Sequence, residues 1–217
     1  MAVTAPPYPV NLLLQGRRVL VVGGGAVAAS KLAGLLDAEA VVHVVAPVVS
    51  PEIKAMAVTW EERPYLAGEV ADYHYVVSCT DDPTVSERVF LDAEAARVFV
   101  NAADVPAHCS ATLPAKHQRG PLLVTVSTSG HSPALAGWLR DQLAGTIGPE
   151  HDQLLELLSA ARVRLAEAGR AASSADWRTA LDSGMLDLLR SGRPNEAERL
   201  LAGALGLGSD PGIRHQA

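Results

Sequence analysis

Polar side chains follow two short apolar runs of this 217-residue sequence, and they include groups suited to proton transfer. Thr80 to Asp82 come after the first run, and Asn101 and Asp104 come after the second. A carboxylate held beyond a strand end can exchange a proton with a bound substrate, so Asp104 is a candidate catalytic residue. Thr80 and Asn101 are candidate cofactor contacts, because ligands of parallel sheets bind beyond the carboxyl ends of the strands. A structural interpretation is also open: residues 80–82 would cap a helix starting near Pro83, and Asp104 would bond to nearby backbone.

A third polar segment places hydroxyl groups, a glycine and a histidine directly before a helical stretch that starts at Pro133. In the simpler interpretation, Ser132 caps this helix and Pro133 is its first residue. In the alternative, the segment is a pocket for a substrate carboxylate, bound by helix N–H groups and by Ser or Thr hydroxyls. The candidate substrate contacts are Thr128, Ser129, Gly130, His131 and Ser132.

The most specific binding motif is the glycine loop Gly23-x-Gly25-x-x-Ala28, which lies between an apolar run and a helical stretch. Gly23 permits a tight turn, Gly25 lets the backbone approach a pyrophosphate, and Ala28 allows close packing of helix on strand. In this setting the motif favours dinucleotide binding over a tight turn in a nucleotide-free sheet. The second strand ends at Ala46 with neither the usual ribose-binding acid nor a basic residue in its place. The residues alone therefore do not separate NAD from NADP.

The elements that must position these residues alternate between strands and helices up to about residue 100. Such alternation indicates βαβ crossovers, so residues 1–112 are predicted to form an α/β domain, a Rossmann-type doubly wound parallel sheet. The expected strands are 19–22, 41–46, 58–62, 73–79 and 97–100, and the expected helices are 26–38, 51–57 and 85–96. Lys31, one helical turn after Val27, is expected to point to solvent.

The pattern changes after residue 110, where two further parts are predicted. Residues 113–146 would form a small α+β segment, and residues 147–217 a helical domain with apolar residues at helical spacing. The expected elements are antiparallel strands at 110–115 and 122–128 joined by a turn at 116–121, and helices at 133–144, 154–165 and 177–188. The Gly-rich stretch 202–208 and the tail beyond it are expected to be frayed.

Composition excludes several classes of protein. The balance of 18 basic and 24 acidic residues gives a net charge of −6, which argues against a general binder of nucleic acid. Cys79 and Cys109 form no C-x-x-C motif and the seven histidines show no ligand spacing, so neither a disulfide framework nor a bound metal is expected. No apolar run is long enough to span a membrane, and residues 1–10 lack the features of a signal peptide. A cytoplasmic protein is predicted.

Together, these motifs occur in the order seen in precorrin-2 dehydrogenases, the siroheme synthase amino-terminal module and its free-standing relatives. The resemblance covers about residues 8–145, and the helical remainder is similar in size and character only. It is carried by Tyr8-Pro9-Val10, Gly23 to Ala28 with Lys31, Thr80 to Asp82, Asn101 with Asp104, and Thr128 to Pro133. Two features differ: Thr128 stands where some siroheme synthases carry a phosphorylatable serine, and 217 residues leave no room for the methyltransferase domain of the fused enzymes.

The resemblance implies NAD-dependent oxidation of precorrin-2 to sirohydrochlorin in siroheme or cobalamin biosynthesis. In some members it also implies metal insertion, with Fe²⁺ or Co²⁺ as the substrate, and no motif here decides whether this chain chelates. A homodimer is implied too, with residues 113–146 as the dimerisation segment. The family's nicotinamide dinucleotide contacts correspond to Ala26, Val27, Pro47 and Val48, and its key carboxylate to Asp104. Two other classes stay open: a dehydrogenase for another small substrate, and an NAD-binding sensor without catalysis.

The uneven distribution of charge bears on the implied substrate. Residues 1–112 hold 7 Lys and Arg against 13 Asp and Glu, whereas residues 113–217 hold 11 of each. Precorrin-2 carries several carboxylates, which an acidic first domain would repel at long range. Binding would need local positive groups, and the second half offers Lys116, Arg119 and Arg140 together with the helix start at Ser132. Arg119 and Arg140 are therefore predicted to contact the tetrapyrrole.

Overall fold

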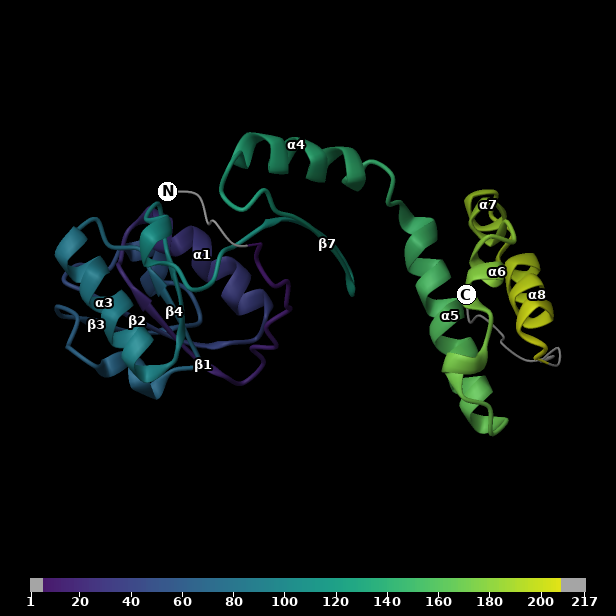
Figure 1. Cartoon of the computed structure of the whole chain (residues 1–217), viewed down its shortest axis with the longest axis horizontal. Coiled ribbons are helices and arrows are strands. Elements are labelled where there is room, and N and C mark those ends of the chain that lie inside the picture. The colour runs from purple at the N-terminus through teal and green to yellow at the C-terminus, as the bar shows by residue number, and fades with distance from the viewer. Residues whose placement is uncertain (1–5, 208–217) are drawn as a thin grey trace. The chain divides into compact units, whose positions relative to one another are not determined.

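The computed structural model describes residues 6–207 and begins with a five-stranded sheet (Figure 1). All neighbouring strands are parallel, and their order is β3-β2-β1-β4-β5. The strands are β1 (Arg18–Val22), β2 (Val41–Ala46), β3 (Thr59–Glu62), β4 (Tyr75–Ser78) and β5 (Phe99–Ala102). The helices between them are α1 (Ala26–Asp37), α2 (Pro51–Lys54) and α3 (Pro83–Ala96). The predicted α/β fold with a Rossmann-type parallel sheet is confirmed.

Both faces of this sheet are buried, which explains why its central strands are continuously apolar. On one face, Val19, Val21 and Val44 pack under α1. On the other face, Leu20 and Val76 pack with residues of α3. Figure 1 shows α1 and α3 on opposite sides of the strands. Because the chain leaves β1 toward β2 and later returns to place β4 on the other side of β1, the carboxyl ends of β1 and β4 form the switch point where such sheets bind ligands.

The hairpin that follows has a different register from the predicted one. It consists of β6 (Ala115–Arg119) and β7 (Leu122–Val126), with Arg119 opposite Leu122 across a two-residue turn. The predicted strand at 110–115 and turn at 116–121 are wrong. The N–H groups of Ser110 and Ala111 instead both donate to the Val100 carbonyl at 3.0 Å, so this stretch runs along β5.

The remaining helices are α4 (Pro133–Ala144), α5 (Pro149–Glu167), α6 (Trp177–Leu181), α7 (Met185–Arg190) and α8 (Pro194–Leu205). The predicted helix at 177–188 is interrupted after Leu181, where α6 ends, and Gly184, with a φ of +92°, is the N-cap residue of α7. Residues 202–205 are not frayed as predicted, because they form the last turn of α8, where Ala202 and Leu205 are buried. The rest of the predicted frayed tail, 208–217, lies outside the described residues.

The chain divides into two compact units. The first comprises the chain up to Pro114 together with Ser127–Pro133, and the second comprises Ala115–Val126 and the chain from Ala134 onward. The segment 113–146 is therefore shared between the two units. Within residues 6–207, no helix is both long and apolar enough to cross a membrane.

Candidate functional site

The glycine loop follows β1 directly and is shaped by close backbone contacts. A Cβ atom on Gly23 would lie 2.5 Å from the Cys79 carbonyl oxygen, and one on Gly24 would lie 2.1 Å from the Val48 carbonyl oxygen. The φ of +127° at Gly23 also disfavours any side chain. By contrast, a Cβ atom on Gly25 would meet nothing within 4 Å. The first two glycines are thus required by the protein itself, whereas Gly25 faces open space.

The start of α1 fits a dinucleotide phosphate. Gly25 is the N-cap residue and provides no side-chain hydrogen bond, and no acidic residue lies in the first turn. The helix N-terminus therefore presents backbone N–H groups and a partial positive charge to the open side of Gly25. Ala28 is fully buried against the sheet, and Ala26 and Val27 are exposed. These residues would hold the pyrophosphate of a bound dinucleotide.

The predicted contacts around the loop are brought together by the same backbone packing. Gly24 lies against Val48, and Gly23 lies against Cys79 and Thr80, where a Cβ atom would be 3.1 Å from the Thr80 nitrogen. Pro47 and Val48 are exposed beside the end of β2. The Asp82 side chain accepts hydrogen bonds from the Thr84 and Val85 N–H groups at 2.8 and 3.3 Å, so the helix cap considered as an alternative for this segment is present.

A carboxylate lies beside the end of β2, although it does not come from that strand. Oε1 of Glu62, the last residue of β3, accepts from the Val49 N–H at 3.1 Å and from Lys54 Nζ at 2.9 Å. The hydrogen bond from Lys54 is the main reason that the pKa of Glu62 lies below its ordinary value, and the Val49 N–H adds to it. The sequence around the end of β2 does not reveal this carboxylate, because only the pairing of β2 with β3 brings Glu62 there.

Asn101 and Asp104 occupy different positions at the end of β5. Asn101 is buried, and its amide donates to the Ala111 carbonyl at 3.0 Å, so its nitrogen holds the chain that returns along β5. Asp104 is exposed and has a φ of +60°. Among the described residues its carboxylate forms no hydrogen bond or ion pair, and the short 3₁₀ turn that follows, Pro106–His108, has Val105 as its N-cap residue. Asp104 is therefore free to meet a ligand.

The charges of Lys31, on α1, and of Asp104 both act on the Cys79 thiol, which follows the end of β4. Burial raises the pKa of the Cys79 thiol to about 11, the Lys31 ammonium opposes this shift, and the Asp104 carboxylate adds to it. Lys31 is half-buried. The Ala103 N–H donates to the Ser78 carbonyl at 2.8 Å and so ties the Asp104 loop to the end of β4. Asp104 and the glycine loop thus share the carboxyl-end edge of the sheet.

The segment before α4 is a loop closed by its own threonine. Thr128 Oγ1 accepts from the Ser132 N–H at 3.1 Å and donates to the Ser132 carbonyl at 3.0 Å. Ser129 and Gly130 adopt left-handed conformations, with φ values of +52° and +80°, and form the turn of this loop. The Thr128 hydroxyl is engaged inside the loop, whereas His131 is exposed. α4 begins at Pro133 as predicted.

The two arginines predicted to bind substrate both belong to the second unit and are ion-paired. Arg119 Nη2 lies 2.7 Å from Asp152 Oδ2, which links the hairpin to α5. Arg140 Nε lies 2.7 Å from Asp141 Oδ1. Both guanidinium groups are half-buried, and each ion pair engages one guanidinium nitrogen, which leaves other N–H groups of the same side chain for a second acceptor.

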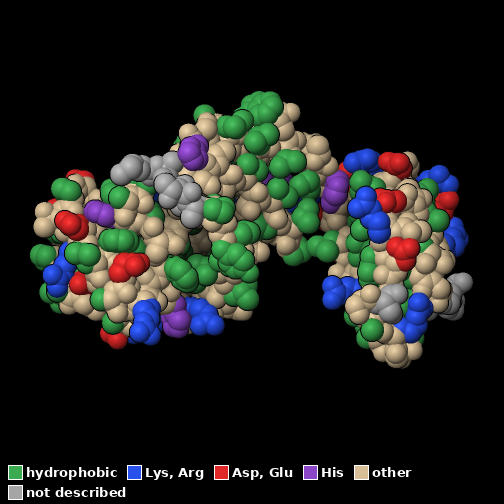
Figure 2. Space-filling model, viewed as in Figure 1, with side chains coloured by type: hydrophobic (Ala, Val, Ile, Leu, Met, Phe, Trp, Pro, Cys, Tyr) green, Lys and Arg blue, Asp and Glu red, His purple; other side chains and the backbone are tan. Residues whose placement is uncertain are grey.

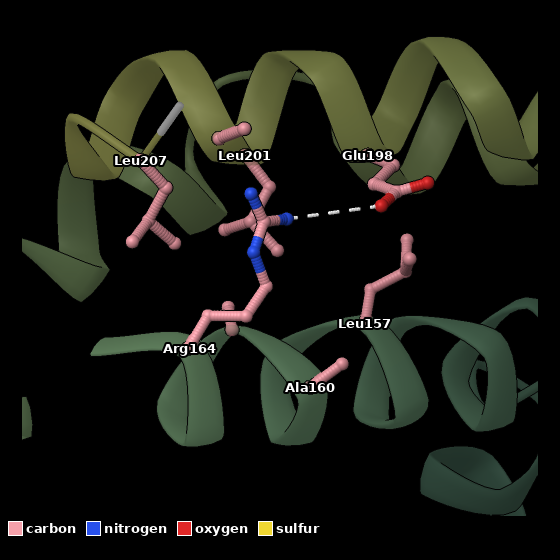
Figure 3. A pocket seen from close by; sticks show the side chains of 8 residues that line it. Leu157, Ala160, Arg164, Glu198, Leu201 and Leu207 are labelled. Carbon is pink, nitrogen blue, oxygen red and sulfur yellow. Dashed lines mark ion pairs between the residues drawn. The ribbon is translucent and has the colours of Figure 1, made fainter. Parts of the chain in front are cut away.

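Two hollows in the described chain contain none of the predicted site residues. One lies between α5 and α8 and is mostly apolar, with Leu157, Leu201 and Leu207 around an Arg164–Glu198 ion pair of 3.9 Å (Figure 3). The other is a polar groove at the amino-terminal edge of the sheet, where Arg18 begins β1 and Thr59 begins β3. The candidate site instead lies at the opposite edge of the sheet.

A five-stranded parallel sheet with a glycine loop at its switch point defines a Rossmann-type dinucleotide-binding protein. Accordingly, residues 10–115 match the NAD(P)-binding family model, and residues 119–146 match the model of the central part of sirohaem biosynthesis proteins. The chain belongs to the family of precorrin-2 dehydrogenases and siroheme synthase amino-terminal modules.

Individual relatives agree with this assignment. The chain is 34% identical to the siroheme synthase of Nitrosococcus oceani over 91% of its own length and 43% of that protein. It is 34% identical to siroheme biosynthesis protein met8 of Schizosaccharomyces pombe over 70% of this chain and 60% of the yeast protein. The solved structure of SirC, a precorrin-2 dehydrogenase, is similar with a TM-score of 0.70 and 26% identity, over 91% of this chain and all of SirC. The chain spans less than half the length of the siroheme synthases that it matches.

Proposed function

We propose that this chain oxidises precorrin-2 to sirohydrochlorin with NAD⁺ as the oxidant. The observation that carries the proposal is the position of Asp104, an exposed carboxylate without a protein partner among the described residues, at the sheet edge that also holds the glycine loop. The similarity to SirC over its whole length supports the substrate.

In the proposed reaction the macrocycle loses a hydride and a proton. NAD⁺, when bound, supplies the hydride acceptor. The backbone N–H groups at the start of α1 would bind its pyrophosphate, and the space beside Gly25 would admit it. Asp104 accepts the proton released from the substrate and returns it to water, as an exposed carboxylate at this edge of the sheet can do.

NAD rather than NADP is proposed on the strength of Glu62. Its carboxylate is held at the Val49 N–H beside the end of β2, where the adenosine ribose of a dinucleotide lies in this fold. A 2′-phosphate there would meet negative charge, and the nearby Lys54 is already engaged by Glu62. The arrangement therefore favours a ribose hydroxyl.

A homodimer in the cytoplasm is part of the proposal. The hairpin and α4 expose large apolar side chains, namely Leu123, Leu135, Trp138 and Leu143. Figure 2 shows apolar side chains gathered on the surface over α4. A second copy of the chain would cover this surface, as apolar patches on oligomeric proteins are covered. Both cysteines are free thiols, which suits a reducing compartment.

Metal insertion is the second candidate activity. The exposed Asp104 carboxylate favours it, since a carboxylate at the macrocycle could take pyrrole N–H protons as Fe²⁺ or Co²⁺ enters. Within residues 6–207 no group of three or more His, Cys, Asp and Glu side chains is arranged to hold a metal ion. In this activity the metal is the substrate that enters the macrocycle.

Anaerobic incubation with precorrin-2 and NAD⁺, followed by absorbance, tests the proposal. We expect sirohydrochlorin and NADH in equal amounts, with the rate greatly reduced in Asp104→Asn while the affinity for NAD⁺ is retained. An NAD-binding sensor would bind the dinucleotide without turnover, and a dehydrogenase for another substrate would leave precorrin-2 unchanged. Wild-type activity in Asp104→Asn would overturn the catalytic role of Asp104. Adding Fe²⁺ or Co²⁺ to the product then tests chelation.

A further inference from the structure

The loop that carries Asp104 is closed at its base by a thiol. The loop leaves β5 at Ala102 and returns at Cys109, and the Cys109 sulfur bridges these two ends. The Ala102 N–H donates to Cys109 Sγ at 3.2 Å, and Sγ donates to the Ala102 carbonyl at 3.3 Å. Sγ also lies 3.5 Å from the Val105 carbonyl and 3.9 Å from the Asn101 amide nitrogen. One side chain thus contacts polar groups of three residues on both sides of Asp104.

These contacts satisfy backbone groups that have no other means of pairing. Ala102 is the last residue of an edge strand and is buried, so its N–H and carbonyl groups are shielded from water. The returning chain pairs with Val100 through Ser110 and Ala111 but leaves Ala102 to the thiol. Leaving a buried backbone group unpaired costs about 1–3 kcal/mol, so the thiol contributes directly to the shape of the loop.

The thiol is in the protonated form that these bonds require. Burial raises the pKa of Cys109, and the hydrogen bond from the Ala102 N–H opposes that shift only in part. A protonated sulfur both donates and accepts, as the paired contacts to Ala102 demand.

We propose that Cys109 is a positioning residue for Asp104: by closing the loop between Ala102 and Cys109, its thiol holds the Asp104 carboxylate at the sheet edge. This inference rests on the proposed function for its kinetic test. Asp104 has a φ of +60°, a left-handed conformation that aspartate adopts more readily than most non-glycine residues but that neighbouring contacts still help to hold. The Cys109 bonds and the Ala103–Ser78 bond flank Asp104 and help to hold that conformation.

A second anchor keeps the loop folded when the thiol is removed. His108 Nδ1 lies 3.2 Å from Ser86 Oγ, and its ring stacks on Phe90 with 5.5 Å between centroids. Ser86 and Phe90 both belong to α3. Removing the thiol is therefore expected to loosen the Asp104 turn without detaching the whole segment from the sheet.

The test compares Cys109→Ala and Cys109→Ser with Cys79→Ala as the matched control. Cys79 is also a half-buried thiol at a strand end, but its sulfur forms no hydrogen bond among the described residues. We expect kcat for precorrin-2 oxidation to fall about 10- to 100-fold in Cys109→Ala, because a small displacement of a catalytic group has effects of this size. The KM for NAD⁺ should stay within about twofold, since the glycine loop is untouched. Cys109→Ser, which keeps a donor and an acceptor, should recover most of the rate.

Amide hydrogen exchange provides a readout that does not depend on the reaction. Exchange at residues 103–108 should be about tenfold faster in Cys109→Ala than in the wild type, and unchanged in Cys79→Ala. Unchanged exchange, or equal loss of kcat in the Ala and Ser variants, would overturn the positioning role. A wild-type protein that does not oxidise precorrin-2 would overturn the proposed function, while the exchange data would still decide the role of Cys109.

Discussion

Alanine substitutions in the glycine loop should separate folding from cofactor binding, because neighbouring glycines are required for different reasons. A Cβ atom at Gly23 would lie 2.5 Å from a backbone carbonyl oxygen at a φ of +127°. A Cβ atom at Gly25 has no neighbour within 4 Å, and its φ is −94°. Gly23→Ala therefore strains the protein, whereas Gly25→Ala places a methyl group only where the dinucleotide would lie.

The magnitudes follow from these two environments. At Gly23, overpacking and backbone strain together cost about 3 kcal/mol or more, which lowers Tm by about 6–12 °C in a chain of this size. At Gly25, an N-cap position, Gly→Ala costs less than about 1 kcal/mol. A methyl group against the bound phosphate costs about 1–3 kcal/mol of binding, which corresponds to about a 5- to 150-fold increase in Kd for NAD⁺.

Calorimetry measures the stability of each variant, and titration of NADH fluorescence measures its affinity. Gly137→Ala is the control, since a Cβ atom there also meets nothing within 4 Å and Gly137 lies within α4, which belongs to the second unit. This control should bind NADH normally and be slightly stabilised, because alanine favours a helix over glycine by about 1 kcal/mol. Unchanged affinity in Gly25→Ala, or a loss of Tm equal to that of Gly23→Ala, would refute the assignment of the open side of Gly25 to the cofactor.

Three further predictions concern charged groups. Glu62→Gln should narrow the preference for NAD⁺ over NADP⁺ by about two- to fivefold in competition titrations, and an unchanged ratio would remove Glu62 from the ribose site. Arg119→Gln should raise the KM for precorrin-2 more than the KM for NAD⁺. Asp152→Asn, which removes only the ion-pair partner of Arg119, should leave the KM for precorrin-2 unchanged. Equal effects of the two variants would indicate that the ion pair is structural. Burial of Asp92 disfavours its charged form, but hydrogen bonds from the Gly68 N–H and Tyr65, aided by Arg88, outweigh this and lower its pKa below 3.8. The contribution of Asp92 to the free energy of unfolding is therefore complete above pH 3.8 and is lost as the pH falls through the lower pKa of the folded state. Asp92→Asn should unfold at a lower urea concentration at pH 7, and its free energy of unfolding should fall less than that of the wild type on acidification. Identical acid profiles of the two proteins would contradict this.

The parallel sheet was predictable from the sequence because each of its strands and helices is identified by residues that are neighbours in the chain. Each central strand is an apolar run buried on both faces, and each following helix begins at a recognisable residue such as Gly25 or Asp82. The hairpin was not predictable in the same way. Residues 116–119 read as a polar turn, yet their alternate side chains are only half-buried in a two-stranded ribbon, so the burial pattern that identifies a strand is weak there.

Candidate site residues that one segment supplies could be proposed from the sequence, whereas contacts between two separate segments could not. The glycine loop and Asp104 stand in sequence beside the strands that position them. The role of Glu62 depends on the β2–β3 pairing, and the bonds of Cys109 depend on the chain returning along β5. Neither contact could be predicted from the sequence, because each joins residues that are not related by helical or strand spacing.

The distribution of cations limits how the first unit could bind a polyanionic substrate. Most basic groups of this unit are engaged elsewhere: Arg63 with Glu61 and Glu69, Lys54 with Glu62, Arg88 with Asp92, and Arg18 over the Tyr73 ring. Lys31 makes no ion pair among the described residues. Its charge acts on the Cys79 thiol, as does the charge of Asp104. It is thus the cation that the first unit offers beside Asp104. A tetrapyrrole with several carboxylates needs more than one such partner, and Lys31 alone does not meet that need. The acidic first unit therefore offers the glycine loop and the Asp104 carboxylate but few unpaired cations, so its own charges disfavour binding a polyanion at long range.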